Sequence, residues 1–195
     1  MLTQRVLGIR KFSEPRSELK PWRVEDLRKI RVGEAPSKDY ATDKKALALS
    51  SHLHPNSVLL SPEADSKWDL INQMVTRLIE GGQLNPSFEA EARQNLRTRE
   101  ESVSTGMEQG IAVPHAAMDG LKHLVAAMAL LPQGIDFQSM DGNPAQIVVL
   151  LLVPKAQKLQ HVRTLTEIAR RLGDPAFRTE LLALDSGADA VQAWA

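Results

Sequence analysis

The clearest hydrophobic pattern in the chain is a helical one that begins after residue 65. Apolar residues recur there every three or four positions: Trp68, Ile71, Met74, Val75, Leu78 and Ile79. This spacing predicts an amphipathic helix, with Asp65 or Ser66 as its N-cap and Gly81-Gly82 at its end. Asn85-Pro86 then has the form of an N-cap followed by proline in the first turn, which predicts a second, more polar helix through about Arg99.

Two unbroken apolar runs, Leu124–Leu131 and Ile147–Val153, have a different character. Short continuous runs bounded by turn residues are typical of strands covered on both faces, and such strands need helices outside them. Further helices are expected at Lys158–Leu172, at Ala176–Leu184 behind the cap Asp174-Pro175, and from about Ala188 to Trp194. The order of elements predicts an α/β fold with a mixed β-sheet flanked by helices on both faces.

The first fifty residues lack a sustained pattern. Pro15, Pro21 and Pro36 interrupt their few large apolar residues, so this part cannot bury much surface, and a short helical patch around Val24–Arg31 is its only predicted element. Residues 1–50 hold 12 Lys and Arg against 7 Asp and Glu, a net charge of +5, whereas residues 51–195 hold 12 against 17, a net charge of −5. We expect a basic, flexible N-terminal extension over residues 1–50 and one folded domain over residues 51–195. Interleaved acids favour a solvated linker over an arm that binds nucleic acid.

Composition limits the chemistry further. The absence of cysteine excludes disulfides, thiolate metal sites and cysteine nucleophiles, and it favours a cytoplasmic location. The sequence has no signal-peptide core, and its longest apolar run is too short for a membrane span, so we expect no membrane insertion. The sequence contains no nucleotide-binding glycine loop and no common hydrolase motif. His52 and His54 are interpreted as surface histidines rather than as part of a metal site.

The stretch GIAVPH, Gly110 to His115, presents one histidine from an unusually restricted backbone. Proline fixes its own φ and favours extended geometry at Val113, so we expect a loop that holds His115 in a defined position. His161 falls in about the first turn of the predicted helix 158–172, near unpaired backbone N–H groups that attract anions. Taken alone, the position of His161 is more typical of a structural residue at the rim of the core.

Arg99 is a third candidate, because it ends the second predicted helix just before that loop. Its charged neighbours Arg97, Glu100 and Glu101 are interpreted as a solvated surface. These three residues suggest a phosphoryl-transfer site. One imidazole would take the phosphoryl group, and the guanidinium of the arginine and the second imidazole would hold the phosphoryl oxygens.

Residues Leu53 to about Ala193 resemble the fructose/mannitol class of enzyme IIA domains of the bacterial phosphoenolpyruvate-dependent phosphotransferase system. The resemblance runs through HLHPNSVLL, REESVSTGMEQGIAVPH, IDFQSMDGNPAQIVVLLLVP and HVRTLTEIARRL. It implies that His115 carries the phosphoryl group and that Arg99 and His161 line its site, within a mixed sheet flanked by helices. Ser104 and Thr105 are weaker candidates for phosphate contacts, since hydroxyl residues beside glycine also serve in turns. No cofactor or metal is implied.

The resemblance implies a phosphocarrier protein similar to HPr as donor and leaves two destinations open. In the nitrogen-regulatory branch, which the C-terminal motifs resemble more closely, phosphorylation governs binding to regulatory target proteins. In the transport branch the group passes to enzyme IIB for uptake of a fructose- or mannitol-type sugar. A non-catalytic binding protein that kept only the fold is a further alternative, although a purely structural fold has no need of all three site residues. Ala117 departs from the polar residue common two positions after the phosphorylated histidine.

Overall fold

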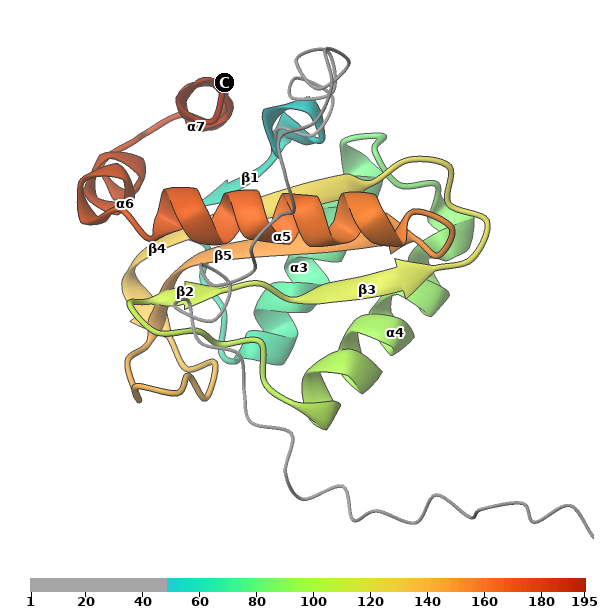
Figure 1. Ribbon diagram of the computed structural model, residues 1–195, viewed down its shortest axis with the longest axis horizontal. Helices are drawn as coiled ribbons and strands as arrows, with labels where there is room; N and C mark the ends of the chain where they lie inside the picture. The colour runs from blue at the N-terminus through green and yellow to red at the C-terminus, as the bar shows by residue number, and fades with distance from the viewer. Residues whose placement is uncertain (1–48) are drawn as a thin grey trace, which may run out of the picture.

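The computed structural model describes residues 49–195, apart from the side chains of Lys158 and Leu159. Its elements, in chain order, are η2 (Leu49–Ser51), β1 (Leu53–Leu60), α3 (Lys67–Glu80), η3 (Pro86–Phe88), α4 (Glu89–Ser102), β2 (Ile111–Ala112), β3 (His115–Met118), β4 (Val125–Ile135), β5 (Ala145–Pro154), α5 (Lys158–Leu172), α6 (Pro175–Leu182) and α7 (Gly187–Ala193) (Figure 1). The helical patch predicted at Val24–Arg31 lies outside the described residues. Within residues 49–195, no helix combines the length and apolar character needed to cross a bilayer.

The sheet is mixed, as predicted. Strands lie in the order β1-β4-β5-β2, and β3 also pairs with β5. β1 runs parallel to β4, β4 runs antiparallel to β5, and both β2 and β3 run parallel to β5. The central strands β4 and β5 are the two that unbroken apolar runs predicted. Residues Ile147 to Val153 of β5 are at most 2% exposed, so this strand is covered on both faces.

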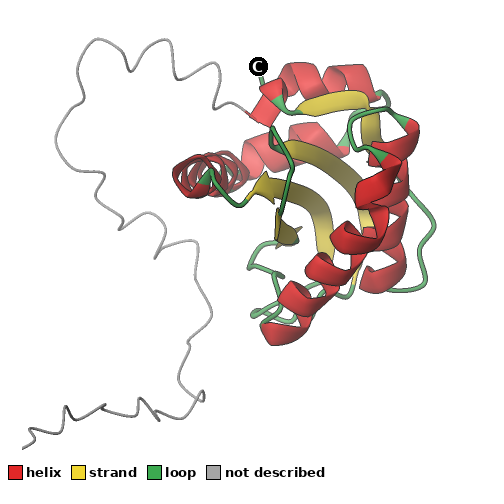
Figure 2. Ribbon diagram, turned by 90° about the vertical axis from the view of Figure 1, so that its right-hand side faces the viewer, coloured by secondary structure: helices red, strands yellow, loops and turns green. Residues whose placement is uncertain are grey.

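Alternate residues of the central strands face two separate cores. Leu150 and Leu152 of β5 pack in the core that contains α3 and α4. Val149 and Leu151 pack in the opposite core with η2, α5, α6 and α7. This alternation follows from the two-residue period of a strand. It produces the helical layers on both faces of the sheet that Figure 2 shows.

Local sequence signals explain where α3 and α4 begin. Ser66 caps α3, because its side chain accepts a hydrogen bond from the backbone N–H of Asp69. Asn85 caps the turn η3, and α4 follows and continues to Ser102, slightly beyond the predicted end at Arg99. The buried residues of α4 are spaced four apart on one side of the helix: Ala92, Leu96 and Glu100. This stripe directs the last turn of α4 against the sheet.

Three strands, β1, β2 and β3, were not predicted. β1 contains Pro55, and its register with β4 shifts between Leu53 and Val58. A proline within a strand is tolerated at a sheet edge or a bulge, and β1 lies at the edge, so its pattern does not read as a strand. β2 and β3 are short and separated by Val113-Pro114. Ile111-Ala112 and His115 of the stretch GIAVPH therefore belong to two short strands, and the expected loop before His115 is reduced to the connection Val113-Pro114.

The C-terminal helices have nearly the predicted bounds and close the second core. Trp194 is fully buried there, edge-on to Phe177 with ring centroids 5.2 Å apart. Arg171 donates to the carbonyl oxygen of Trp194 at 2.8 Å, which satisfies the end of α7. Leu49, which lies before the boundary predicted between residues 50 and 51, is also fully buried in this core.

Candidate functional site

His115 is the first residue of β3, and hydrogen bonds fix the backbone before it on two sides. The N–H of Val113 donates to the carbonyl oxygen of Thr105 at 3.1 Å. The N–H of Leu151 in β5 donates to the carbonyl oxygen of Pro114 at 2.9 Å. Pro114 adds its own fixed φ. The chain therefore presents the imidazole from a strand end that the sheet and the proline both restrain.

One ring nitrogen of His115 is bound to the backbone. Its Nδ1 lies 2.8 Å from the carbonyl oxygen of Val113. Since a carbonyl oxygen only accepts hydrogen bonds, Nδ1 carries the hydrogen of the neutral ring. Nε2 then has a lone pair, and it accepts a hydrogen bond from Nε of Arg99 at 3.3 Å. Nε2 is therefore the nucleophilic atom of this imidazole.

The structure brings all three predicted residues together. The rings of His115 and His161 have centroids 5.0 Å apart and planes tilted by 57°. His161 comes from the first turns of α5, and its Nε2 is buried with no hydrogen-bond partner within residues 49–195. Arg99 comes from the last turn of α4 and donates a second hydrogen bond, from Nη1 to the carbonyl oxygen of Val103 at 2.7 Å. A buried nitrogen without a partner beside a guanidinium suits an anionic group that would satisfy both.

Burial and charge keep both imidazoles neutral near pH 7. Burial is the largest of the effects that together lower the pKa of His115 to about 4. The positive charge of Arg99 acts in the same direction, and the Val113 hydrogen bond and the Glu100 carboxylate oppose the shift. Burial, followed by the charge of Arg99, also lowers the pKa of His161. The positive charge beside the two rings therefore comes from the guanidinium of Arg99.

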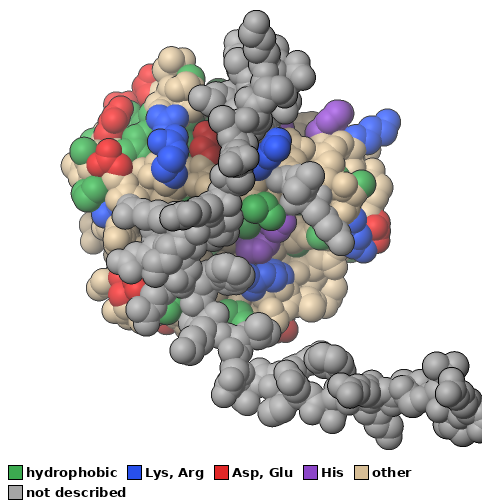
Figure 3. Space-filling model, viewed as in Figure 1, with side chains coloured by type: hydrophobic (Ala, Val, Ile, Leu, Met, Phe, Trp, Pro, Cys, Tyr) green, Lys and Arg blue, Asp and Glu red, His purple; other side chains and the backbone are tan. Residues whose placement is uncertain are grey.

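A mainly apolar cavity of about 330 Å³ opens beside Arg99 and His115. Its rim includes Val103, Met140 and Val162, which are 38%, 38% and 50% exposed. Figure 3 shows apolar, histidine and basic side chains adjoining one another on this face. Exposed apolar side chains around a polar centre are typical of surfaces that bind other proteins.

Ser104 and Thr105 line the same cavity, and their hydroxyl groups contact Glu100. The hydroxyl of Ser104 donates to Oε1 of Glu100 at 3.0 Å, and the hydroxyl of Thr105 donates to Oε2 at 2.6 Å. Ser104 also contacts the carbonyl oxygen of Phe137. The loop that the sequence linked to phosphate therefore lies at the site, with both hydroxyl groups bound to a carboxylate.

Glu100 corrects the sequence interpretation, which placed it on a solvated surface. It is 3% exposed, and its Oε1 lies 2.8 Å from Nζ of Lys67. The four-residue spacing in α4 could have predicted the burial of Glu100, because Glu100 continues the buried stripe of Ala92 and Leu96. Arg97 and Glu101 do form an exposed pair, with Nε and Oε1 2.8 Å apart, as expected.

Comparison with known proteins identifies the family. Residues 51–193 match the family described as "Phosphoenolpyruvate-dependent sugar phosphotransferase system, EIIA 2". This match spans most of the chain, so the chain belongs to the enzyme IIA family of that system. The resemblance inferred from the motifs around His115 is thereby confirmed.

Individual relatives carry two kinds of name. A nitrogen regulatory protein of Pseudomonas aeruginosa is 31% identical over 136 residues, which are 69% of this chain and 86% of that protein. A fructose-specific EIIABC component of Bacillus subtilis is 28% identical over 140 residues, which are 72% of this chain and only 22% of that longer protein. The crystal structure of the nitrogen regulatory protein IIA-Ntr from Neisseria meningitidis has a TM-score of 0.69 and 25% identity, covering 75% of this chain and 99% of that one.

Proposed function

We propose that this chain is a phosphoryl carrier that accepts the group on Nε2 of His115 from an HPr-like phosphocarrier protein. One observation carries the proposal: Nε2 has a lone pair and faces the guanidinium of Arg99, next to the ring of His161, whose Nε2 has no hydrogen-bond partner in the described part of the chain. A neutral imidazole is a nucleophile near pH 7, and its bond to phosphorus is readily broken by the next acceptor. Family membership supports the same chemistry.

The site residues have separate roles in the proposed transfer. The lone pair of His115 Nε2 forms a bond to phosphorus as the bond between phosphorus and the imidazole of the donor protein breaks. The donor imidazole keeps the electron pair of the broken bond. Arg99 exchanges its hydrogen bond to Nε2 for hydrogen bonds to the phosphoryl oxygens, and His161 Nε2 contacts another oxygen. The carbonyl oxygen of Val113 stabilises the charge that the phosphorylated ring acquires at Nδ1–H. Ser104 and Thr105 line the cavity and are weaker candidates for phosphate contacts, because their hydroxyl groups would have to exchange the Glu100 carboxylate for a phosphoryl oxygen.

We assign residues 51–195 as the carrier domain and residues 1–50 as an N-terminal extension, which agrees with the family match over residues 51–193. The output we favour is regulatory, with the phosphorylation state of His115 controlling binding to target proteins. Two relatives of which the match covers 82% and 86%, one of them from Pseudomonas aeruginosa, are named nitrogen regulatory proteins. Transfer to enzyme IIB is the second candidate, supported by the fructose-specific relative.

The test is phosphorylation in a defined mixture of phosphoenolpyruvate, enzyme I and HPr. The wild-type protein should gain one phosphate that is acid-labile and base-stable, and His115→Gln should gain none because an amide nitrogen is not a nucleophile. His123→Gln is the matched control, since His123 is an exposed histidine that does not line the cavity, and this variant should accept phosphate on His115 normally.

Phosphate on the His115→Gln variant would contradict the assignment. The labelled wild-type protein is then mixed with purified fructose- and mannitol-type IIB domains. Retention of the label supports the regulatory output, whereas rapid loss to IIB supports the transport output.

A further inference from the structure

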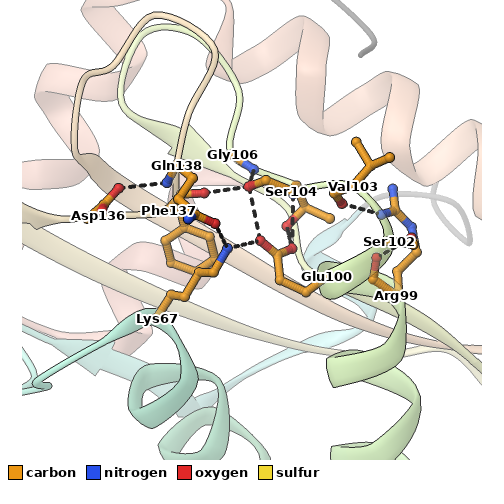
Figure 4. A network of polar contacts seen from close by, with 11 residues as sticks. Lys67, Arg99, Glu100, Ser102, Val103, Ser104, Gly106, Asp136, Phe137 and Gln138 are labelled. Atoms are coloured by element: carbon orange, nitrogen blue, oxygen red, sulfur yellow. Dashed lines mark hydrogen bonds and ion pairs between the residues drawn. The ribbon is translucent and has the colours of Figure 1, made fainter. Parts of the chain in front are cut away.

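The carboxylate of Glu100 is buried and fully occupied at the end of α4. Its Oε2 accepts hydrogen bonds from the N–H and the hydroxyl of Thr105, at 2.9 and 2.6 Å. Its Oε1 accepts from the hydroxyl of Ser104 at 3.0 Å and from Nζ of Lys67 at 2.8 Å. Figure 4 shows Glu100 between Lys67 and Ser104, next to Arg99 on the same helical turn. Because the hydroxyl of Ser104 has one hydrogen and also contacts the carbonyl oxygen of Phe137, the main donors to this carboxylate are Lys67 and Thr105.

Lys67 connects a further loop to this carboxylate. It is the first residue of α3, is 7% exposed, and also donates to Oε1 of Gln138 at 2.9 Å. The N–H of Gln138 donates in turn to Oδ1 of Asp136 at 2.7 Å. Gln138 belongs to the loop that supplies Met140 to the rim of the cavity. The ion pair therefore joins the start of α3, the end of α4 and two loops at the site.

A continuous line of hydrogen bonds leads from Glu100 to the imidazole of His115. Thr105 donates its N–H to Glu100 and accepts, at its carbonyl oxygen, from the N–H of Val113 at 3.1 Å. Val113 accepts, at its own carbonyl oxygen, from Nδ1 of His115 at 2.8 Å. A displacement of Thr105 would therefore move the carbonyl group that decides which ring nitrogen carries the hydrogen.

Stability alone does not account for this buried pair. The cost of removing two charges from water offsets their attraction, so apolar residues of similar volume often serve a core equally well. The groups that Glu100 holds, in contrast, belong to the loop that contacts both Arg99 and Val113. The arrangement is therefore better explained by the geometry of the site than by the strength of the core.

We propose that Glu100, with Lys67 as its counter-ion, is a positioning residue for phosphoryl transfer at His115. This inference rests on the proposed function. Glu100 holds Thr105 so that Val113 keeps the hydrogen on Nδ1 and the lone pair on Nε2. It makes no contact with the phosphoryl group itself.

The experiment compares Glu100→Gln with the matched control Glu101→Gln, which changes the neighbouring exposed carboxylate in the same way. Phosphorylation of His115 is measured at saturating phosphorylated HPr. We expect Glu100→Gln to slow transfer roughly 10- to 100-fold, the range expected for a small displacement of reacting groups, and Glu101→Gln to retain the wild-type rate. The ring nitrogen NMR signals of unphosphorylated His115 should show a mixture of tautomers in Glu100→Gln and a single Nδ1–H tautomer in the other two proteins.

Glu100→Gln leaves the charge of Lys67 buried without a counter-ion, so K67M/E100Q is the second variant. It removes both charges at similar volume, and we expect it to fold with the urea midpoint of the wild type and still to transfer slowly with mixed tautomers. A wild-type rate and a single tautomer in this folded variant would overturn the proposal. If the wild-type protein accepts no phosphate, the proposed function fails, and the tautomer measurement still decides the role of Glu100.

Discussion

The imidazole of His115 has Nδ1 bound to Val113 and Nε2 facing Arg99, and these contacts govern its protonation as well as its position. A proton on Nε2 would displace the hydrogen bond from Arg99 and place two positive charges side by side. Burial opposes the charged ring more strongly still. The imidazole of His115, the proposed nucleophile, is therefore kept neutral over the whole physiological range of pH.

We predict that His115 stays neutral as the pH falls from 8 to 5, with a pKa of about 4 against an ordinary 6.5. Arg99→Ala should raise this pKa because it removes a positive neighbour, but leave it below 6.5 because burial remains. Ring nitrogen and proton NMR shifts measure both values. A wild-type His115 that titrates near pH 6.5 would contradict the prediction.

The same shift has a consequence for stability. As the pH is lowered, His115 takes up a proton in the unfolded chain at a higher pH than in the folded protein. The contribution of its lowered pKa to the free energy of unfolding is therefore complete above about pH 6.5 and is lost as the pH falls toward 4. His115→Gln should therefore lose less stability than the wild type between pH 7 and pH 5 in urea unfolding.

Helix α4 shows how one element supplies two different functional groups. Consecutive helical residues point about 100° apart, so Arg99 reaches the cavity while Glu100 turns toward the core. The stripe of Ala92, Leu96 and Glu100 fixes the rotation of the helix about its axis. Packing at Leu96, one turn before Glu100, thus sets the direction in which Arg99 projects.

Leu96→Ala tests this packing. Leu96 is 1% exposed in the core, so we predict a loss of about 2–5 kcal/mol in the free energy of unfolding. Thr98→Ala, an exposed position on the same helix, should change it by about 0.5 kcal/mol or less. Urea unfolding measures both, and equal small effects would show that α4 is not held by its buried stripe.

Elements with a strong period or an unbroken apolar run could be predicted from the sequence, as α3, β4 and β5 were. β1 could not, because Pro55 and the register shift at the sheet edge hide its alternation. At the site, the proline before His115 and the motif match indicated the three central residues. The buried role of Glu100 depends on which face of α4 meets the sheet, and its charge pointed to solvent.

The whole molecule brings the site together at one edge of the sheet. β3, which begins with His115, pairs with β5 beside the short strand β2. Arg99 reaches the ring from the helical layer on one face, and His161 reaches it from the layer on the other. The site therefore lies where both layers end, with Val103, Met140 and Val162 exposed around its cavity.

The most direct measurement is NMR of the phosphorylated wild-type protein with nitrogen-15 in its histidine rings. We predict one phosphorus signal, coupled to Nε2 of His115, while Nδ1 keeps its hydrogen and donates it to the carbonyl oxygen of Val113. His161 should remain unphosphorylated and shift only through its new contact with a phosphoryl oxygen. Phosphate bonded to Nδ1 of His115, or to any other histidine, would contradict the geometry on which the account rests.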